Sequence, residues 1–189
     1  MTAEKERECR LVHPIPPVYD RNARILILGS FPSVKSREAG FYYGHPQNRF
    51  WKVLASVLQD DVPEDIEGKK IFLIRHRIAL WDVIGSCEIA GSSDASIRNV
   101  AVNDLTRILE QADIRAVFVN GKTAERYYRK YTLPRTGRPA VVLPSTSPAN
   151  AAWNLERLTE AWSRILRFLN GEEADSGRIA RDLREERTP

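Results

Sequence analysis

A run of four apolar residues, Ile25-Leu26-Ile27-Leu28, stops at Gly29 and constrains the fold more than any other stretch of the chain. A short apolar run without polar alternation is typical of a strand that is buried on both faces of a parallel sheet. Similar short strands are expected at 78–83, 116–119 and 141–143. We therefore predict an α/β fold, a three-layer α/β/α sandwich with a short central, mainly parallel, four-stranded sheet.

Most of the segments between these strands have apolar residues at helical spacing, and two segments do not. The intervals 30–47 and 85–95 are rich in Gly, Pro or Ser and are expected to be loops. The pattern predicts helices at 48–59, 68–77, 104–111, 122–131 and 153–170.

The chain of 189 residues is long enough for one α/β domain and too short for two ordinary ones. We expect a flexible N-terminal arm at 1–15, one folded domain at 16–170 and a charged C-terminal tail at 171–189. The N-terminus is too charged for a signal peptide, and no apolar run is long enough for a membrane helix. These features predict a cytoplasmic protein that does not bind a membrane, with Cys9 and Cys87 as free thiols.

Several classes of chemistry lack their motifs. No Gly-x-Gly-x-x-Gly or Gly-x-x-x-x-Gly-Lys segment follows the first strand, which disfavours dinucleotide redox chemistry and nucleotide hydrolysis. The absence of Gly-x-Ser-x-Gly disfavours acyl transfer. His13, His45 and His76 lack the spacing of zinc ligands, so we predict no metal and no cofactor. The net charge of +4, carried mostly by Arg, indicates a polyanionic partner or simply a solvated surface.

Three segments stand out from this background. They are Gly29-Ser30-Phe31-Pro32-Ser33, the stretch GFYYGHPQNRFW at 40–51, and the stretch LPSTSPAN at 143–150. The first and third resemble motifs one and two of the uracil-DNA glycosylase superfamily. The second resembles the His-Pro-x-Asn-x-Phe-Trp segment of its mismatch-specific and hypoxanthine-specific branches. In order and spacing the chain is most similar to the hypoxanthine-DNA (deoxyinosine) glycosylases over about 16–169.

This resemblance implies a monofunctional DNA glycosylase that hydrolyses the N-glycosidic bond of a deaminated base and does not cleave the strand. The folded domain at 16–170 would then be a glycosylase domain that acts in base excision repair, as a monomer, on double-stranded DNA containing a deaminated base. Hypoxanthine is the base that the resemblance favours. A uracil-preferring enzyme, a catalytically silent lesion-binding protein and a small-molecule-binding domain are the alternatives.

The resemblance also implies a catalytic role for Asn48. The mismatch-specific branch has a catalytic Asn as the third residue of motif one, where this chain has Phe31. A phenyl ring cannot orient a water molecule, and this departure motivates the silent alternative. In the hypoxanthine-specific branch the catalytic Asn lies downstream, at the position of Asn48. Alternatively, Asn48 serves only as the cap of the following helix.

Four residues are expected to bind the base. Tyr43 is the expected stacking platform, with Phe41 and Tyr42 either in reserve or anchoring the loop. The backbone N–H groups of Ser30 and Phe31 lie in a loop suited to donating to the O6 atom of hypoxanthine. The Asn120 side chain would read the base edge or, alternatively, form a turn.

The loop at 145–148 is expected to bind DNA. Its residues Ser145, Thr146, Ser147 and Pro148 suit phosphate contacts and insertion into the minor groove. A Ser/Pro-rich surface turn is the alternative. Asp82, Asp94 and His45 are candidates for protonating a leaving purine, and their spacing selects none of them.

Overall fold

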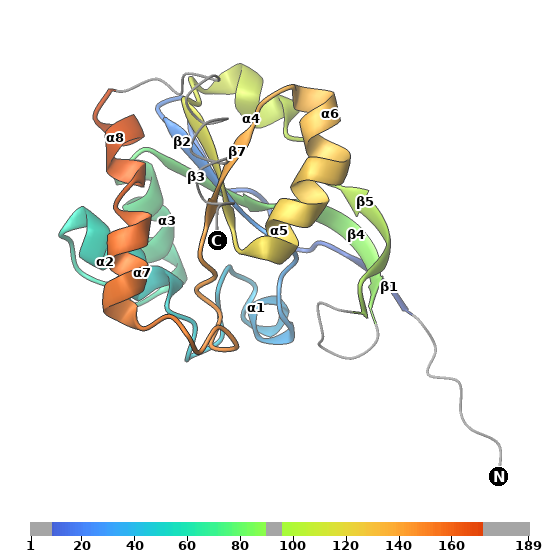
Figure 1. The fold of residues 1–189 in the computed structure, drawn as a ribbon, viewed down its shortest axis with the longest axis horizontal. Helices are drawn as coiled ribbons and strands as arrows, with labels where there is room; N and C mark the ends of the chain where they lie inside the picture. The colour runs from blue at the N-terminus through green and yellow to red at the C-terminus, as the bar shows by residue number, and fades with distance from the viewer. Residues whose placement is uncertain (1–8, 90–95, 172–189) are drawn as a thin grey trace, which may run out of the picture.

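The computed structural model describes residues 9–89 and 96–171. Its centre is a four-stranded sheet in the order β3-β2-β6-β7, and all three pairings are parallel. The predicted α/β sandwich with a central parallel sheet is thus confirmed, and Figure 1 shows helices on both of its sides. The strands are β2 (Ile25–Gly29), β3 (Ile78–Asp82), β6 (Ala116–Asn120) and β7 (Ala140–Leu143).

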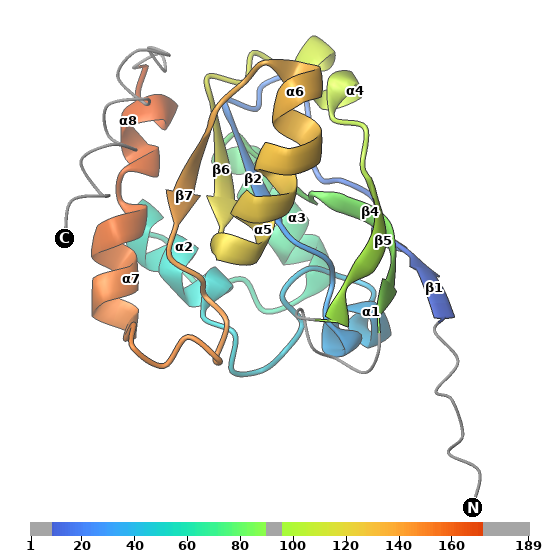
Figure 2. The same cartoon turned by 45° about the vertical axis from the view of Figure 1, so that its right-hand side comes forward.

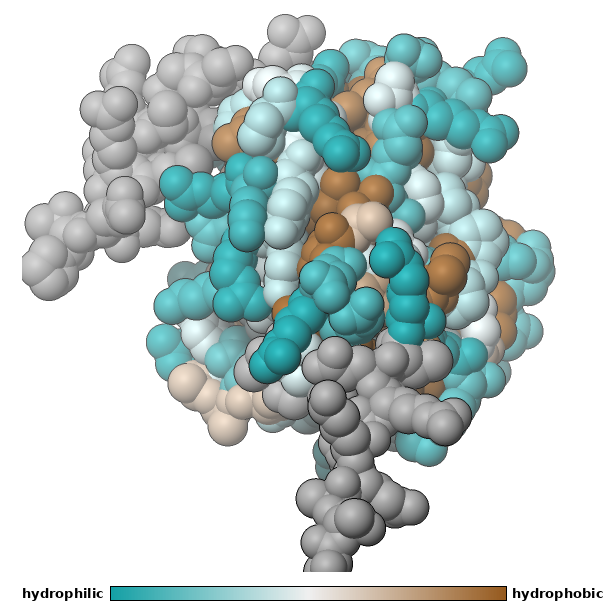
Figure 3. Space-filling model, turned by 90° about the vertical axis from the view of Figure 1, so that its right-hand side faces the viewer, coloured by the Kyte–Doolittle hydropathy of each residue, from teal (hydrophilic) through white to brown (hydrophobic). Residues whose placement is uncertain are grey.

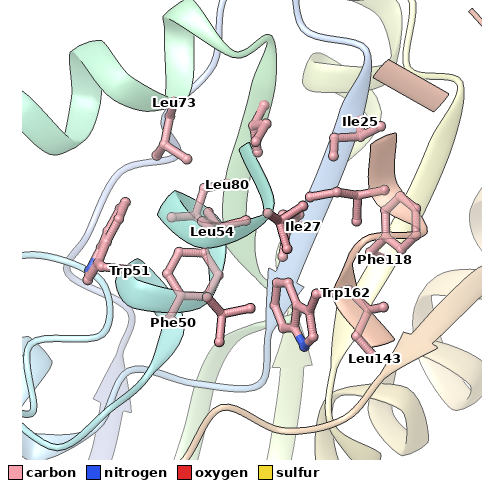
Figure 4. Packing of buried hydrophobic residues seen from close by; sticks show 14 of the residues in the cluster. Ile25, Ile27, Phe50, Trp51, Leu54, Leu73, Leu80, Phe118, Leu143 and Trp162 are labelled. Carbon is pink, nitrogen blue, oxygen red and sulfur yellow. The ribbon is translucent and has the colours of Figure 1, made fainter. Parts of the chain in front are cut away.

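Alternate side chains of β2 enter different halves of the core, as expected for a strand covered on both faces. Ile25 and Ile27 belong to a cluster that includes side chains from the helices on one side, several of which Figure 4 shows. Leu26 and Leu28 belong to the cluster on the other side. The first side is covered by α2 (Phe50–Leu58), α3 (Ile66–Arg75), α7 (Leu155–Trp162) and α8 (Ile165–Leu169), and the second by α4 (Thr106–Gln111) and α5 (Lys122–Tyr127).

A second sheet, which the sequence pattern did not predict, lies beside the helices of the second side (Figure 1). It has the order β1-β4-β5 and is antiparallel throughout, with β1 at Cys9–Val12, β4 at Ile84–Ile89 and β5 at Arg98–Val102. The expected loop at 85–95 therefore starts as a strand, and residues 90–95 lie outside the described part. The expected arm at 1–15 likewise gives way to structure at Cys9, and its first eight residues are outside the description.

The second sheet shields the core with one of its faces. Cys87 of β4 is buried, whereas most of β5 is exposed or half-buried. Figure 3 shows this side of the molecule as mostly hydrophilic, with hydrophobic residues in a central band.

Three helical segments differ from their predictions. The expected loop 30–47 contains a short helix, α1 (Val34–Ala39), which the Ser33 side chain caps and which ends at Gly40 with a positive φ of 68°. The expected helix 122–131 passes from α5 into a π-helical turn, Tyr128–Thr132, and then into α6 (Leu133–Thr136). The expected helix 153–170 is divided into α7 and α8.

The carboxyl ends of the parallel strands point to one end of the molecule. Figure 2 shows α1 and the connection that follows β7 both at this end. Ligands of open parallel sheets bind beyond these strand ends. Among the described residues, no helix has both the length and the apolar character needed to cross a membrane.

Candidate active site

A cavity of about 1420 Å³ opens beyond the carboxyl ends of the strands. It exceeds the roughly 300–1,000 Å³ of a typical small-molecule site, so it has room for a ligand larger than a single ring system. The structure brings nearly all of the predicted site residues to this cavity. Its lining includes Ser30, Phe31, Tyr43, Asn48, Asn120, Ser145, Thr146 and Ser147, whereas Pro148 is exposed and is not part of the lining.

Asn48 lies at the entrance to α2 with its side chain fixed by two hydrogen bonds. Its Oδ1 accepts from the backbone N–H of Phe50 and from the hydroxyl of Thr146, each at 3.0 Å. Asn48 thus accepts from the first residue of α2, but the N-cap residue is Arg49 and not Asn48, which was the alternative expectation. Since Oδ1 faces the protein, Nδ2 is the end of the amide left for a ligand, and it donates to none of the described residues.

The bond from Thr146 belongs to a longer network, which we call the bonded wall and which consists of Tyr43, Asn48, Asn120 and Thr146. Asn120 Nδ2 donates to the hydroxyl of Thr146 at 3.0 Å and to that of Tyr43 at 3.2 Å. The backbone N–H of Thr146 donates to Asn120 Oδ1 at 3.1 Å. Three segments far apart in sequence are thus joined around one face of the cavity, and each side chain is held in one orientation.

This network changes the expected roles of two residues. Thr146 was expected to contact DNA, but it is 0% exposed and its hydroxyl is used within the protein. Asn120 was expected to read the base, yet both hydrogens of its Nδ2 are donated to protein hydroxyls. The geometry therefore gives these two side chains a positioning role. Ser145 and Ser147 remain half-buried on the lining, where their hydroxyls accept local backbone bonds.

Tyr43 presents a supported aromatic ring to the cavity. It stacks on Phe50 with 3.8 Å between the ring centroids and 16° between the ring planes. Burial, and secondarily the negative charge of Asp82, raise the pKa of the Tyr43 phenol well above its usual value, so the hydroxyl stays protonated. With one face covered by Phe50, the other face is available to a planar ligand.

The two preceding aromatic residues anchor the loop, which was the alternative expected for them. Both are buried, and Phe41 stacks on Trp51 with 6.0 Å between centroids. The hydroxyl of Tyr42 donates to the carbonyl of Pro16 at 2.9 Å. These contacts fix the positions on either side of Tyr43, whose own φ of 53° lies in the left-handed region.

A second group of lining residues, which we call the open wall, consists of Gly29, Ser30, Phe31 and Asp82; it adjoins the bonded wall at Gly29, which lies next to both Asp82 and Tyr43. The backbone N–H groups of Ser30 and Phe31 donate to no described residue, although both residues line the cavity. Buried backbone donors normally have a partner, so two free N–H groups in a cavity suggest an acceptor supplied by a ligand.

Asp82, at the end of β3, is buried next to these amides. Its side chain is 5% exposed, and its Oδ2 accepts a hydrogen bond of 2.7 Å from His13 Nε2. The Nδ1 atom of His13 accepts the backbone N–H of Ile15 at 3.2 Å, which places the ring hydrogen on Nε2. Of the two other candidates for proton transfer, His45 accepts a hydrogen bond at Nδ1 from the backbone N–H of Gln47, and Asp94 lies outside the described residues.

Arg49 is a site residue that sequence reasoning missed. Its guanidinium donates to the carbonyl groups of Thr146 at 3.3 Å, Ser147 at 2.6 Å and Asn150 at 3.1 Å, and also to that of Trp153. One side chain therefore holds most of the loop after β7 in place. An Arg directly after Asn48 was visible in the sequence, but its partners are main-chain groups about 100 positions away, which no sequence pattern indicates.

The rim of the cavity is basic. Among the described residues of the lining, Glu160 is the only acidic one apart from Asp82, and it is accompanied by Arg37, Lys122, Arg164 and Arg167. A cavity with a basic rim, an aromatic platform and free amide donors is suited to a planar heterocycle attached to a polyanion.

Comparison with known proteins gives a consistent result. The family model of the uracil DNA glycosylase superfamily matches residues 16–166. A protein from Methanosarcina acetivorans named hypoxanthine DNA glycosylase is 35% identical over 154 residues, which make up 80% of this chain and 96% of that relative. A protein of the same name from Methanosarcina barkeri is 32% identical over 154 residues, with the same coverage of 80% and 96%.

A solved structure is similar as well. It is a solution NMR structure of a protein from Methanosarcina acetivorans described as a candidate uracil DNA glycosylase. The two structures superpose with a TM-score of 0.72 at 34% sequence identity, and the match covers 85% of this chain and 99% of the other. The family match over most of the folded domain, together with these relatives, shows that the chain belongs to the uracil DNA glycosylase superfamily.

Proposed function

We propose that this protein is a monofunctional DNA glycosylase that hydrolyses the N-glycosidic bond of deoxyinosine and releases hypoxanthine. The observation that carries the proposal is the orientation of Asn48, whose amide is fixed through Oδ1 and offers Nδ2 to the same cavity as Tyr43. The curated relatives named hypoxanthine DNA glycosylase support the choice of base.

The target nucleotide must leave the duplex before it can react, which costs a few kcal/mol. Stacking of the extruded base on the free face of Tyr43 offsets about 1–3 kcal/mol of this cost. The basic rim holds the flanking phosphates, and Ser145, Ser147 and Pro148 meet the backbone next to the extruded nucleotide. The base then contacts the bonded wall through its ring face and the open wall through its edge.

Cleavage makes the sugar more positive and the leaving base more negative. Asn48 Nδ2 donates to a water molecule, which fixes the water oxygen near the sugar carbon that it attacks. The N–H groups of Ser30 and Phe31 donate to O6 of hypoxanthine, where negative charge develops as the bond breaks. The water is the nucleophile: its oxygen bonds to the sugar carbon as the N-glycosidic bond breaks, and the proton that it loses is balanced by the proton that the departing hypoxanthine anion takes up. No covalent enzyme intermediate forms, so the strand is not cleaved by the protein.

A catalytically silent lesion-binding protein is the alternative suggested by Phe31. Phe31 lines the cavity, where its ring cannot orient water, but Asn48 belongs to the same lining. Asn48 can therefore orient the water in place of the Asn that motif one lacks at Phe31. The presence of Asn48 favours a catalytic protein over a silent one.

The test is a panel of duplexes that contain one deoxyinosine, deoxyuridine or deoxyxanthosine each. Purified protein is added in excess, and alkali-labile sites are scored over time. We expect hypoxanthine to be released fastest, with strand breaks only after alkali. Release of uracil alone would contradict the choice of base, and specific binding without release of any base would contradict catalysis.

Three further expectations remain predictions within this proposal. Activity on double-stranded DNA is tested by repeating the deoxyinosine assay with the single strand alone. The monomeric state is tested by light scattering of the purified protein. A cytoplasmic location is tested by fractionation of source cells.

A further inference from the structure

The second carboxylate oxygen of Asp82 has no partner among the described residues, in spite of the burial of this side chain. Oδ2 is bound by His13, while Oδ1 accepts no hydrogen bond from them. Asp82 lines the cavity, and its Oδ1 lies so close to Gly29 that a Cβ atom built there would be 2.2 Å away. A buried acceptor without a partner costs free energy unless a ligand supplies the donor.

The orientation of the Asp82 carboxylate is fixed by His13. The Ile15 amide fixes the His13 tautomer with hydrogen on Nε2, and Nε2–H donates to Oδ2. His13 is itself buried, with a side chain that is 2% exposed. Asp82 is therefore the acceptor of this pair, and its free oxygen is offered to the cavity as a second acceptor.

The free acceptor lies beside free donors. Ser30 directly follows Gly29, and the N–H groups of Ser30 and Phe31 are unused by the described residues. An acceptor next to a donor is complementary to a ring N–H next to a carbonyl, which is the lactam edge of hypoxanthine and of uracil. Adenine and cytosine, their amino parents, present a ring lone pair next to an amino group. With this reversed pattern, the ring lone pair of the base would face the Asp82 carboxylate, and the amino group of the base would face the N–H groups of Ser30 and Phe31. Both contacts are repulsive.

We propose that Asp82, positioned by His13, accepts a hydrogen bond from the lactam N–H of the extruded base and so selects deaminated bases over their amino parents. The inference rests on the proposed function and deepens it, because it assigns the recognition of deamination to a specific atom. Asp82 touches the base in this assignment, whereas His13 acts only through Asp82.

The test is Asp82→Asn, which preserves the size of the side chain. Since His13 Nε2 donates, the new amide turns its oxygen to His13 and its NH₂ group to the cavity, so a donor replaces the acceptor. Binding is measured with duplexes that carry 2′-fluoroarabino nucleotides of hypoxanthine or of unsubstituted purine. The fluorine suppresses cleavage, and unsubstituted purine lacks the N1–H.

For the wild-type protein we expect hypoxanthine to bind about ten- to a hundredfold more tightly than purine, the range for hydrogen bonds to a charged group. Asp82→Asn should weaken hypoxanthine binding about tenfold or more and change purine binding by less than about threefold. Asp104→Asn, which removes an exposed carboxylate before α4, is the matched control and should change neither.

Each contrary result has a distinct meaning. An equal loss for both bases would reveal a structural or proton-donating role for Asp82, and no loss would remove it from recognition; either outcome overturns the inference. If Asp82→Asn does not fold by circular dichroism, equal wild-type affinities for the two bases would overturn it. A wild type that discriminates between these bases in binding but releases no hypoxanthine from cleavable duplexes would contradict the proposed function alone.

Discussion

The two walls of the cavity use their polar groups in opposite ways. In the bonded wall, the side chains of Asn120 and Thr146 form their hydrogen bonds with each other and with Tyr43 and Asn48. In the open wall, the Ser30 and Phe31 amides and one oxygen of Asp82 have no partner among the described residues. The comparison indicates that one wall is rigid before the ligand arrives and positions the reacting groups. The other wall is completed by the ligand and recognises it.

The largest effect is expected where the bonded wall meets the reaction. Asn48→Ala removes the Nδ2 donor, and we expect single-turnover release of hypoxanthine to fall by about a hundredfold or more because the water loses its position. Affinity for a non-cleavable duplex should change by less than about threefold. Gln47→Ala, which removes the exposed amide of the preceding residue, is the control. Near-normal release by Asn48→Ala would show that the bonded wall serves structure alone.

The next effect should arise in the open wall, from Gly29→Ala. The added Cβ would lie 2.2 Å from Asp82 Oδ1 and 3.0 Å from the Tyr43 hydroxyl, so the carboxylate must move. We expect affinity for a deoxyinosine duplex analogue to fall at least about tenfold, and the free energy of unfolding to fall by about 1–3 kcal/mol through overpacking. Gly68→Ala in α3 is the control for the substitution itself. Unchanged affinity would mean that the open wall does not contact the base.

Arg49→Lys tests whether the hydrogen bonds of Arg49 to the loop after β7 keep Thr146, and with it the bonded wall, in place. A lysine ammonium cannot reproduce a fork that donates to four carbonyl groups, so several of them lose their partner. We expect the free energy of unfolding to fall by about 1–3 kcal/mol and the single-turnover rate to fall up to about tenfold. Chemical denaturation measures the first quantity. Arg157→Lys, at an exposed arginine that donates to one carbonyl, should be close to neutral.

The smallest effect is expected for Thr146→Val, which keeps the shape and removes the hydroxyl. Asn48 loses one of the two bonds that orient it, and Asn120 loses an acceptor. We expect a three- to tenfold slower release, as an order-of-magnitude value, and a loss of about 1–2 kcal/mol in unfolding free energy. Thr159→Val, which removes a hydroxyl that donates only to a backbone carbonyl of α7, is the control. A loss as large as that of Asn48→Ala would show that the network takes part in the chemistry directly.

The parallel sheet was predictable because buried parallel strands are short, apolar runs, and β2 shows this with all five residues buried. The second sheet was not predictable, because β5 has the sequence Arg-Asn-Val-Ala-Val, which is not a continuous apolar run. It is a strand because it pairs with β4. The division of the last helix was also hidden, since its apolar face continues from Leu158 and Trp162 to Ile165 and Leu169.

For the site, the sequence located the segments but not how their atoms are used. Tyr43 and Asn48 line the cavity as expected, because their motif carries both of them into one loop. The burial of Thr146 and the bonds of Asn120 depend on contacts between β6, β7 and α2, which no local pattern contains. The pairing of His13 with Asp82 spans 69 positions and was equally hidden.

The place of His13 in the chain has a consequence for base selection. The family-model match begins at residue 16, so His13 and β1 precede the matched region. If Asp82 selects the base as proposed, its orientation depends on a residue that lies outside the three motif segments. A substitution at His13 would then change lesion preference while every residue of the motif segments stays the same.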